Sequence, residues 1–233
     1  MRRSLIALAV VAVMVLAASV PASAQTWIQL RYWSTSNSSY ESGNTWSSPL
    51  LGFSLRRDVM QSAWALSFNL DSGSVNDWTG GWVGPGLFNR FWNFNVHRNF
   101  SMANGRVSFY AGYGGSAFED PGFPWYVRLN GFRLGVDGKI NFRENWYLMG
   151  DLGYTPRQTG SQLNFNLGGV VNMPTSLLDY KVALGYNFSP TLGAEVGYRG
   201  IDWRYDPTIM CGGSTNCGLK LGGWYVGLNF IMP

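Results

Sequence analysis

The sequence predicts an all-β protein, a transmembrane antiparallel up-and-down β-barrel of about ten strands. Three observations carry this prediction. The chain is rich in aromatic residues and glycine, with 14 Phe, 12 Tyr, 11 Trp and 30 Gly among 233 residues. Only 13% of the residues are charged, which is about half the usual share. Apolar residues recur at every second position in many short segments, a period that places them on one face of a strand.

The N-terminal segment reads as a secretory signal peptide. Two arginines precede an apolar run from Leu5 to Ala18, and Ala22-Ser23-Ala24 is a small-residue cleavage site. The run is short for a membrane-spanning helix, which needs about 20 apolar residues. We therefore divide the chain into a signal peptide, residues 1–24, and an outer-membrane barrel domain, residues 25–233, and predict export.

The remaining sequence excludes several classes of protein. No later stretch is apolar for long enough to form a membrane-spanning helix. A barrel hides the same apolarity in alternation, with one face toward lipid and the other toward the lumen. A secreted β-sandwich is the alternative, but this chain has few charges to cover its outside. The net charge of +4 includes Arg2 and Arg3, and no basic run occurs, so nucleic acid is not an expected partner.

Alternation predicts ten strands, at residues 26–34, 50–57, 64–71, 87–97, 107–114, 126–140, 146–154, 179–188, 192–199 and 220–230. Short and long connections alternate between them, and outer-membrane barrels likewise have short periplasmic turns and longer outer loops. Both termini then lie at the periplasmic end. Residues 163–167 are expected to form a strand extension above the membrane. Two other counts stay open: twelve strands if this segment spans the membrane with a partner, and eight if weak pairs merge.

The last strand, Lys220 to Phe230, has the clearest pattern. Trp224, Val226, Leu228 and Phe230 form a lipid-facing side, while small or polar residues lie between them. We expect this strand to close the barrel by pairing with the first one. We also expect its register to slip at Gly222-Gly223, because simple parity would place Lys220 in lipid.

The same parity places charges of both signs inside the barrel. Six are positive and five negative: Arg31, Arg56, Arg133, Lys139, Lys181 and Arg199, with Asp71, Asp137, Asp151, Asp179 and Glu195. Buried charges are costly unless they are paired. This near balance favours a filled, hydrogen-bonded lumen over a pore, which prefers a filter of one sign. Inward glycines make room for long side chains in the first case and leave a thin water path in the second.

No catalytic, cofactor or metal site emerges from the sequence. The chain has one histidine, His97, which parity places at the periplasmic end of the fourth strand. We expect no serine–histidine or carboxylate–histidine arrangement around it, because no motif for either is present. His97 is therefore interpreted as a structural or interfacial polar residue. Asp71 is interpreted as a lone acid beside a loop.

The long loops contain two further features. Cys211 and Cys217 are six positions apart in a Gly/Ser/Thr/Asn segment, and a disulfide between them is expected in an oxidising compartment, with free thiols as the alternative. The loops also carry aromatic residues: Tyr40, Trp46, Trp78, Trp82, Phe123 and Trp125. These residues form either the outer aromatic girdle or a surface that binds a glycan, a host protein or another cell.

With these features, the chain resembles bacterial outer-membrane β-barrel proteins of the small OmpA/OmpX-like type. The resemblance rests on the signal peptide, on hairpins such as Tyr180–Arg199, and on the last strand. It implies outer-membrane lipid and the barrel assembly machinery, which reads an aromatic last strand, as partners. Ile231-Met232-Pro233 departs from the pattern because the aromatic residue is not terminal.

The expected function is non-enzymatic: a role in membrane integrity, or in surface interaction with a ligand of the outer loops. A small passive pore is the alternative, and a lipid- or peptide-processing enzyme is a third possibility. No cofactor is expected.

Overall fold

The computed structural model describes residues 25–39, 45–59, 62–74, 88–119, 126–156, 158–165, 169–171, 175–205 and 218–232. These residues form strands and short turns. Twelve strands are present: β1 Thr26–Ser39, β2 Thr45–Asp58, β3 Trp64–Ser74, β4 Phe88–Met102, β5 Gly105–Glu119, β6 Tyr126–Asn141, β7 Trp146–Thr155, β8 Gln158–Phe165, β9 Gly169–Val171, β10 Thr175–Asn187, β11 Leu192–Tyr205 and β12 Gly218–Met232. In this part of the chain, no helix is long and apolar enough to cross a membrane.

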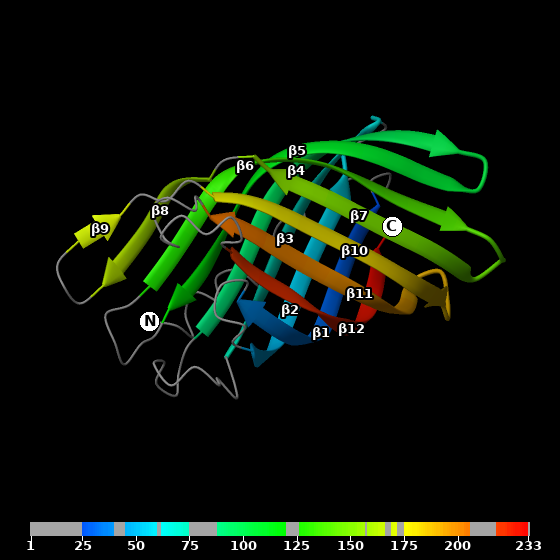
Figure 1. Ribbon diagram of the computed structural model, residues 1–233. Coiled ribbons are helices and arrows are strands. Elements are labelled where there is room, and N and C mark those ends of the chain that lie inside the picture. Colours follow the sequence, from blue (N-terminus) through cyan, green and yellow to red (C-terminus); the bar gives the residue numbers. More distant parts are fainter. Residues whose placement is uncertain are drawn as a thin grey trace.

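Ten of these strands close into a single antiparallel barrel (Figure 1). Consecutive strands pair from β1 to β7, β10 pairs with β7, and β12 returns to β1. The two others form a hairpin in which β8 pairs with the beginning of β6 and β9 pairs with β8. The prediction of a ten-stranded barrel is therefore confirmed, and the counts of eight and twelve are excluded.

Several strands are longer than their apolar pattern. β1 continues to Ser39 and β2 begins at Thr45, whereas alternation ended the first strand at residue 34 and began the second at residue 50. The additional residues are mostly Ser, Thr and Asn, which favour turns in isolation. They nevertheless pair in register with one another across β1 and β2. The ladder joins backbone groups, so it continues beyond the apolar band whatever the side chains are.

The barrel closes between the first and last strands as expected. The β1–β12 register runs without a shift from Thr26↔Met232 to Ser39↔Leu219. The expected slip at Gly222-Gly223 is therefore wrong. Lys220 keeps the outward parity of Trp224 but lies beyond the apolar band, opposite Asp202 of β11 and next to the long connection. The Lys220 side chain avoids lipid without a register shift, because the strand extends past the lipid-facing region.

The outer wall of the barrel is apolar. Its exposed side chains include Leu30, Tyr32, Leu51, Leu66, Phe94, Val96, Phe109, Tyr113, Phe132, Leu134, Leu148, Leu152, Tyr154, Val182, Leu184, Val196, Trp224, Val226, Leu228 and Phe230. So much contiguous apolar surface is found on proteins that face lipid. Toward the long connections the Tyr198 and Trp224 rings meet edge to face at 5.8 Å, and Tyr198 covers Gly222. Tyrosine and tryptophan are enriched at the depth of the lipid headgroups, because their rings are amphipathic.

An apolar layer fills the lumen on the side of the long connections. It consists of inward-facing residues that are almost fully buried: Trp33, Leu50, Phe91, Leu129, Leu177, Ile201, Trp203 and Leu221. Trp203 packs on Phe91 with ring centroids 5.3 Å apart, and its Nε1 donates to Ser116 Oγ at 3.2 Å. The sequence analysis missed this layer because it assigned the apolar positions to the lipid-facing side.

The outer wall generates a prediction about depth in the bilayer. Val196 is 47% exposed and pairs with Leu184 and Val226. A Val196→Arg substitution should lower the free energy of unfolding by about 2–4 kcal/mol, the cost of a cation at the bilayer midplane. Guanidinium titration of the barrel in lipid vesicles, followed by tryptophan fluorescence, measures this loss.

Ser34 supplies the control, because it is exposed on the same outward face of β1, two residues beyond Tyr32 toward the long connection. Ser34→Arg should cost less than about 1 kcal/mol, as cations do near the interface. Equal losses for both variants would contradict the proposed membrane position of the wall.

Candidate functional site

A chain of ion pairs crosses the middle of the lumen. Asp71 of β3 accepts hydrogen bonds from Arg31 Nε at 2.6 Å and from Arg199 Nη1 at 2.5 Å. Arg199 also donates to Asp179 at 3.0 Å, and Asp179 accepts from Arg133 Nη1 at 2.9 Å. Each of these five residues is at least nine-tenths buried. The signs alternate along the chain, so that every buried charge lies beside an opposite one.

Asp71 is therefore not a lone acid beside a loop, and that interpretation was wrong. Its side chain is 1% exposed and pairs with arginines from β1 and β11. At the other end of the chain, Tyr110 OH donates to Asp151 Oδ1 at 2.7 Å and accepts from Arg133 Nη2 at 2.9 Å. The tyrosine links a carboxylate to an arginine that lies 3.6 Å away from it.

Glycine makes room for this chain at one position in particular. A Cβ atom at Gly52 would lie 2.2 Å from Asp71 Oδ1 and 2.5 Å from Arg31 Nε. Real Cβ atoms do not approach other atoms so closely. Gly52 therefore makes room for long side chains in the lumen; it does not leave a water path.

A second cluster surrounds Glu195 of β11. Its carboxylate accepts from Tyr225 OH at 2.6 Å and from Asn229 Nδ2 at 3.3 Å, and Lys181 Nζ lies 3.9 Å away. Tyr225 and Asn229 belong to the uncharged inward side of β12. Although the inward side of the last strand carries no charge, it supplies two of the donors that hold this carboxylate.

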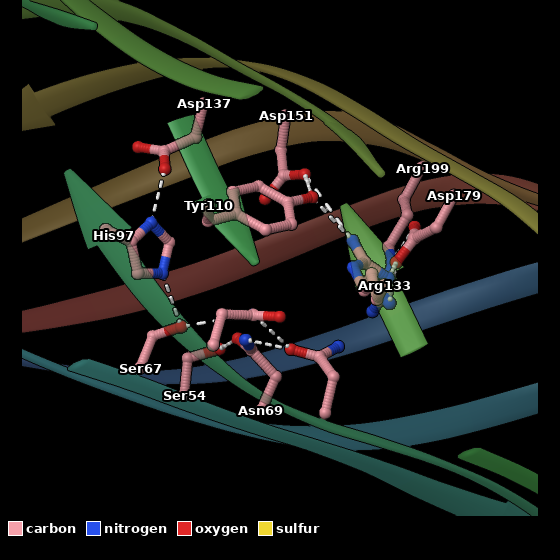
Figure 2. Close-up of polar contacts among 12 residues, drawn as sticks. Ser54, Ser67, Asn69, His97, Tyr110, Arg133, Asp137, Asp151, Asp179 and Arg199 are labelled. Carbon is pink, nitrogen blue, oxygen red and sulfur yellow. Dashed lines mark hydrogen bonds and ion pairs between the residues drawn. The ribbon is translucent and has the colours of Figure 1, made fainter. Parts of the chain in front are cut away.

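A third cluster lies nearer the short turns and contains the histidine (Figure 2). His97 of β4 is 3% exposed, and its Nδ1 lies 2.8 Å from Asp137 Oδ2. Its Nε2 lies 2.8 Å from Ser67 Oγ. The expectation that no serine–histidine or carboxylate–histidine arrangement exists is therefore wrong. The lack of such an arrangement was the reason for expecting no enzyme, and that reason no longer holds.

Arg56 fixes the carboxylate of this cluster. Its Nη1 donates to Asp137 Oδ1 at 2.8 Å, and its Nη2 donates to Asn99 at 2.7 Å and to Ser108 at 2.9 Å. The sequence contained part of this signal, since parity alone turns Ser67, His97 and Asp137 inward. The sequence could not show that Asp137 of β6 reaches His97 of β4, because β5 lies between these two strands in the sheet.

Two cations near the short turns have aromatic rings as their contacts. Lys139 Nζ lies 3.9 Å from the ring centroid of Tyr147 and 4.4 Å from that of Trp27. Arg106 lies over the same tryptophan at 5.5 Å, and its Nε is buried without a hydrogen-bond partner. At the short-turn end, Arg56, Arg106 and Lys139 line one cavity with a single carboxylate, Asp58.

The lumen cavities that described residues line are small. One of about 80 Å³ lies beside His97 and Ser67, another of about 80 Å³ lies at the short-turn end, and one of about 20 Å³ borders the apolar layer. A larger hollow of about 570 Å³ is lined mainly by outward residues such as Leu30, Val196 and Leu228. That hollow lies on the outer apolar wall and not in the lumen.

The structure does not test the predicted features of the long loops. Cys211 and Cys217 lie outside the described residues, as do Tyr40, Trp78, Trp82, Phe123 and Trp125, while only the backbone of Trp46 is described. The expected disulfide and the expected loop surface therefore stay predictions. Among the described residues, no three His, Cys, Asp or Glu side chains are placed to hold a metal ion.

Comparisons with known proteins identify the fold. No family model matches the chain, and no curated protein matches its sequence. Among solved structures, the outer membrane protease OmpT from Escherichia coli is 14% identical, covering 89% of this chain and 96% of its own, with a TM-score of 0.53. The translocator domain of the autotransporter NalP from Neisseria meningitidis is 13% identical, covering 98% and 95%, with a TM-score of 0.41.

The attachment invasion locus protein Ail of Yersinia pestis, solved with a heparin analogue, is 14% identical, covering 89% and 98%, with a TM-score of 0.38. All of these structures are bacterial outer-membrane β-barrels. At such low identity the likeness shows the fold alone. The protein thus has the fold of the small bacterial outer-membrane barrels, and its specific role is not determined by this likeness.

The central ion chain generates a prediction about stability. Arg199→Ala leaves Asp71 and Asp179 with one arginine each and should lower the free energy of unfolding by about 3–5 kcal/mol, as removing one partner of a buried pair does. Arg204→Ala removes an exposed partner of Asp202 and should cost less than about 1 kcal/mol. Denaturant titration in lipid vesicles measures both, and equal costs would contradict the importance of the chain.

The close approach at Gly52 generates a second prediction. Gly52→Ala should cost about 1–3 kcal/mol through overpacking against the Arg31–Asp71 pair. Gly150→Ala is the matched control, because its Cβ would meet nothing nearer than 3.7 Å. The denaturant midpoint of each variant tests this difference. A Gly52 variant as stable as the wild type would show that the ion pair relaxes without cost.

Proposed function

We propose that this protein is an integral outer-membrane barrel with a sealed lumen, which acts in membrane integrity or surface interaction rather than in transport. The observation that carries the proposal is the chain of buried ion pairs from Arg31 to Asp151, which crosses the lumen beneath the apolar layer. A pore needs a continuous water path and a filter that ions can leave. Paired arginines and carboxylates in the middle of the lumen oppose both requirements.

The apolar layer supports the same proposal. An ion that passes from the long-loop side would first have to separate Trp33, Trp203, Phe91 and their neighbours, which are at most a few per cent exposed. It would then meet arginines and carboxylates that already neutralise one another. The small passive pore is therefore the weaker candidate, because the lumen cavities that described residues line are no larger than about 80 Å³.

Placement in the membrane follows from the general properties of such barrels. The short turns after β2, β4, β6 and β10 belong at the periplasmic side, and the longer connections at the cell surface. Export by the signal peptide and insertion by the barrel assembly machinery, through Trp224, Val226, Leu228 and Phe230, belong to the proposal. The loops at the outer end would then be the surface offered to a ligand.

Ion flux across vesicles tests the sealed lumen. We expect vesicles that contain the protein to release potassium no faster than empty vesicles, because the paired charges and the buried apolar side chains oppose the passage of an ion. Flotation of the protein with the vesicles, together with heat-modifiable migration, establishes that a folded barrel has inserted. Potassium release that rises in proportion to the inserted protein would overturn the proposal in favour of the pore.

A further inference from the structure

The hydrogen bonds around His97 fix where its protons lie. Asp137 Oδ2 is 2.8 Å from Nδ1, and a carboxylate can only accept, so Nδ1 carries a proton and donates it. In the neutral imidazole, Nε2 is then the acceptor, and the Ser67 hydroxyl donates to it across 2.8 Å. The contact of 3.4 Å between Arg56 Nη1 and Nδ1 joins two donors and is not a hydrogen bond in this state.

This order of groups is the one that activates a serine. The nucleophile lies on Nε2, where the imidazole takes its proton, and the carboxylate lies on Nδ1, where it holds the tautomer and stabilises the imidazolium. Another buried lumen serine, Ser116, is paired differently, since it accepts from Trp203. If these side chains only filled the lumen, each polar group would need a hydrogen-bond partner. The serine would not need to lie on Nε2, nor the carboxylate on Nδ1.

The serine also borders free space. The cavity of about 80 Å³ is lined by Ser67, His97, Asn69 and Asn95, among others. Such a space is large enough for several water molecules or one short acyl group. It shares Trp27, Arg56 and Arg106 with the cavity at the short-turn end, whereas the ion chain and the apolar layer lie on its other side. A small molecule would therefore reach Ser67 from the short-turn end.

We propose that Ser67, His97 and Asp137 form a serine-nucleophile site that cleaves short carboxylic esters. Ser67 Oγ attacks the ester carbonyl carbon while its proton moves to His97 Nε2. The C–O bond to the alcohol then breaks, the alcohol leaves with that proton, and the acyl group stays on Ser67. Water, deprotonated by the same imidazole, attacks the acyl-serine and releases the carboxylic acid and the free serine.

A donor for the developing oxyanion lies beside the nucleophile. Asn95 Nδ2 is 3.2 Å from Ser67 Oγ, and it also donates to Asn93 Oδ1 at 2.8 Å. Side-chain amides serve as oxyanion donors when they are fixed in place. Asn95 is 3% exposed and is held on β4, two residues before His97. We assign it as the group that contacts the reacting carbonyl oxygen.

The cations near the short turns define the substrate further. Three cations, Arg56, Arg106 and Lys139, line the end cavity with one carboxylate, Asp58, and the buried Nε of Arg106 has no hydrogen-bond partner. A carboxylate on the substrate would satisfy this donor and offset part of the excess positive charge. The substrate class is therefore a short ester that carries a carboxylate, in preference to a neutral ester of the same length.

Methanesulfonyl fluoride tests the nucleophile, because it is small and leaves a methanesulfonyl group on an activated serine as fluoride departs. The mature chain is folded in detergent micelles, treated with the reagent, and mapped by peptide mass spectrometry. We expect the label on Ser67 and none on Ser116. This measurement needs no variant. A folded barrel that stays unlabelled at Ser67 would overturn the proposal and leave the cluster as polar filling of the lumen.

Two variants and a control separate activation from accessibility. His97→Gln should slow the labelling of Ser67 by at least about 100-fold, as loss of a general base does. Ser116→Ala should leave the rate unchanged, and heat-modifiable migration shows which variants are folded. If His97→Gln does not fold, Asp137→Asn is used instead and should also slow the labelling. A rate that does not depend on the histidine or its carboxylate would count against activation.

Ester hydrolysis tests the substrate class. Monomethyl succinate should be cleaved with a lower KM than methyl butyrate, with methanol release followed by proton NMR, and Lys139→Met should remove at least half of that advantage. Equal KM values would overturn the assignment of the cations. The test is independent of the sealed lumen, since the ester is expected to enter and leave at the short-turn end, and vesicle leakage reports on passage through the whole barrel.

Discussion

The charges in the middle of this barrel find their opposites within the lumen, because the lipid outside the wall offers none. The alternation of Arg31, Asp71, Arg199, Asp179 and Arg133 satisfies this requirement with contacts of 2.5 to 3.0 Å between successive members. These residues come from five strands, so the chain also ties distant parts of the wall together. Removing one member leaves an uncompensated charge in a site of low polarity, which is why the arrangement acts as a unit.

The lumen is divided along its length. Apolar side chains such as Trp33 and Trp203 occupy the side of the long connections, the ion chain lies in the middle, and the polar cluster around His97 lies nearer the short turns. Water-sized space remains in this last part. The division gives the barrel two chemically different ends, and it restricts any small molecule inside the lumen to entry from one of them.

The sequence was sufficient for the wall of the barrel. Alternation with period two assigns residues such as Val196 and Trp224 to the outside and Arg199 and Glu195 to the inside. It identified neither the partners of Asp71 nor the neighbours of His97, because a strand pattern gives the direction of a side chain and not the distance across the lumen. It also missed Trp33 and Trp203, since an inward apolar residue and an outward one look alike in a single strand.

The rigid wall of the barrel also positions the proposed reactive group. Ser67 and His97 belong to adjacent strands of one hairpin, and Asp137 reaches them from β6. In many enzymes such groups are placed by loops, whereas here each stands on a hydrogen-bonded strand of a closed sheet. Arg56 further anchors the carboxylate through the oxygen that His97 does not use. A serine held in this way is preorganised before any substrate arrives, so its reactivity depends on access through the short-turn end.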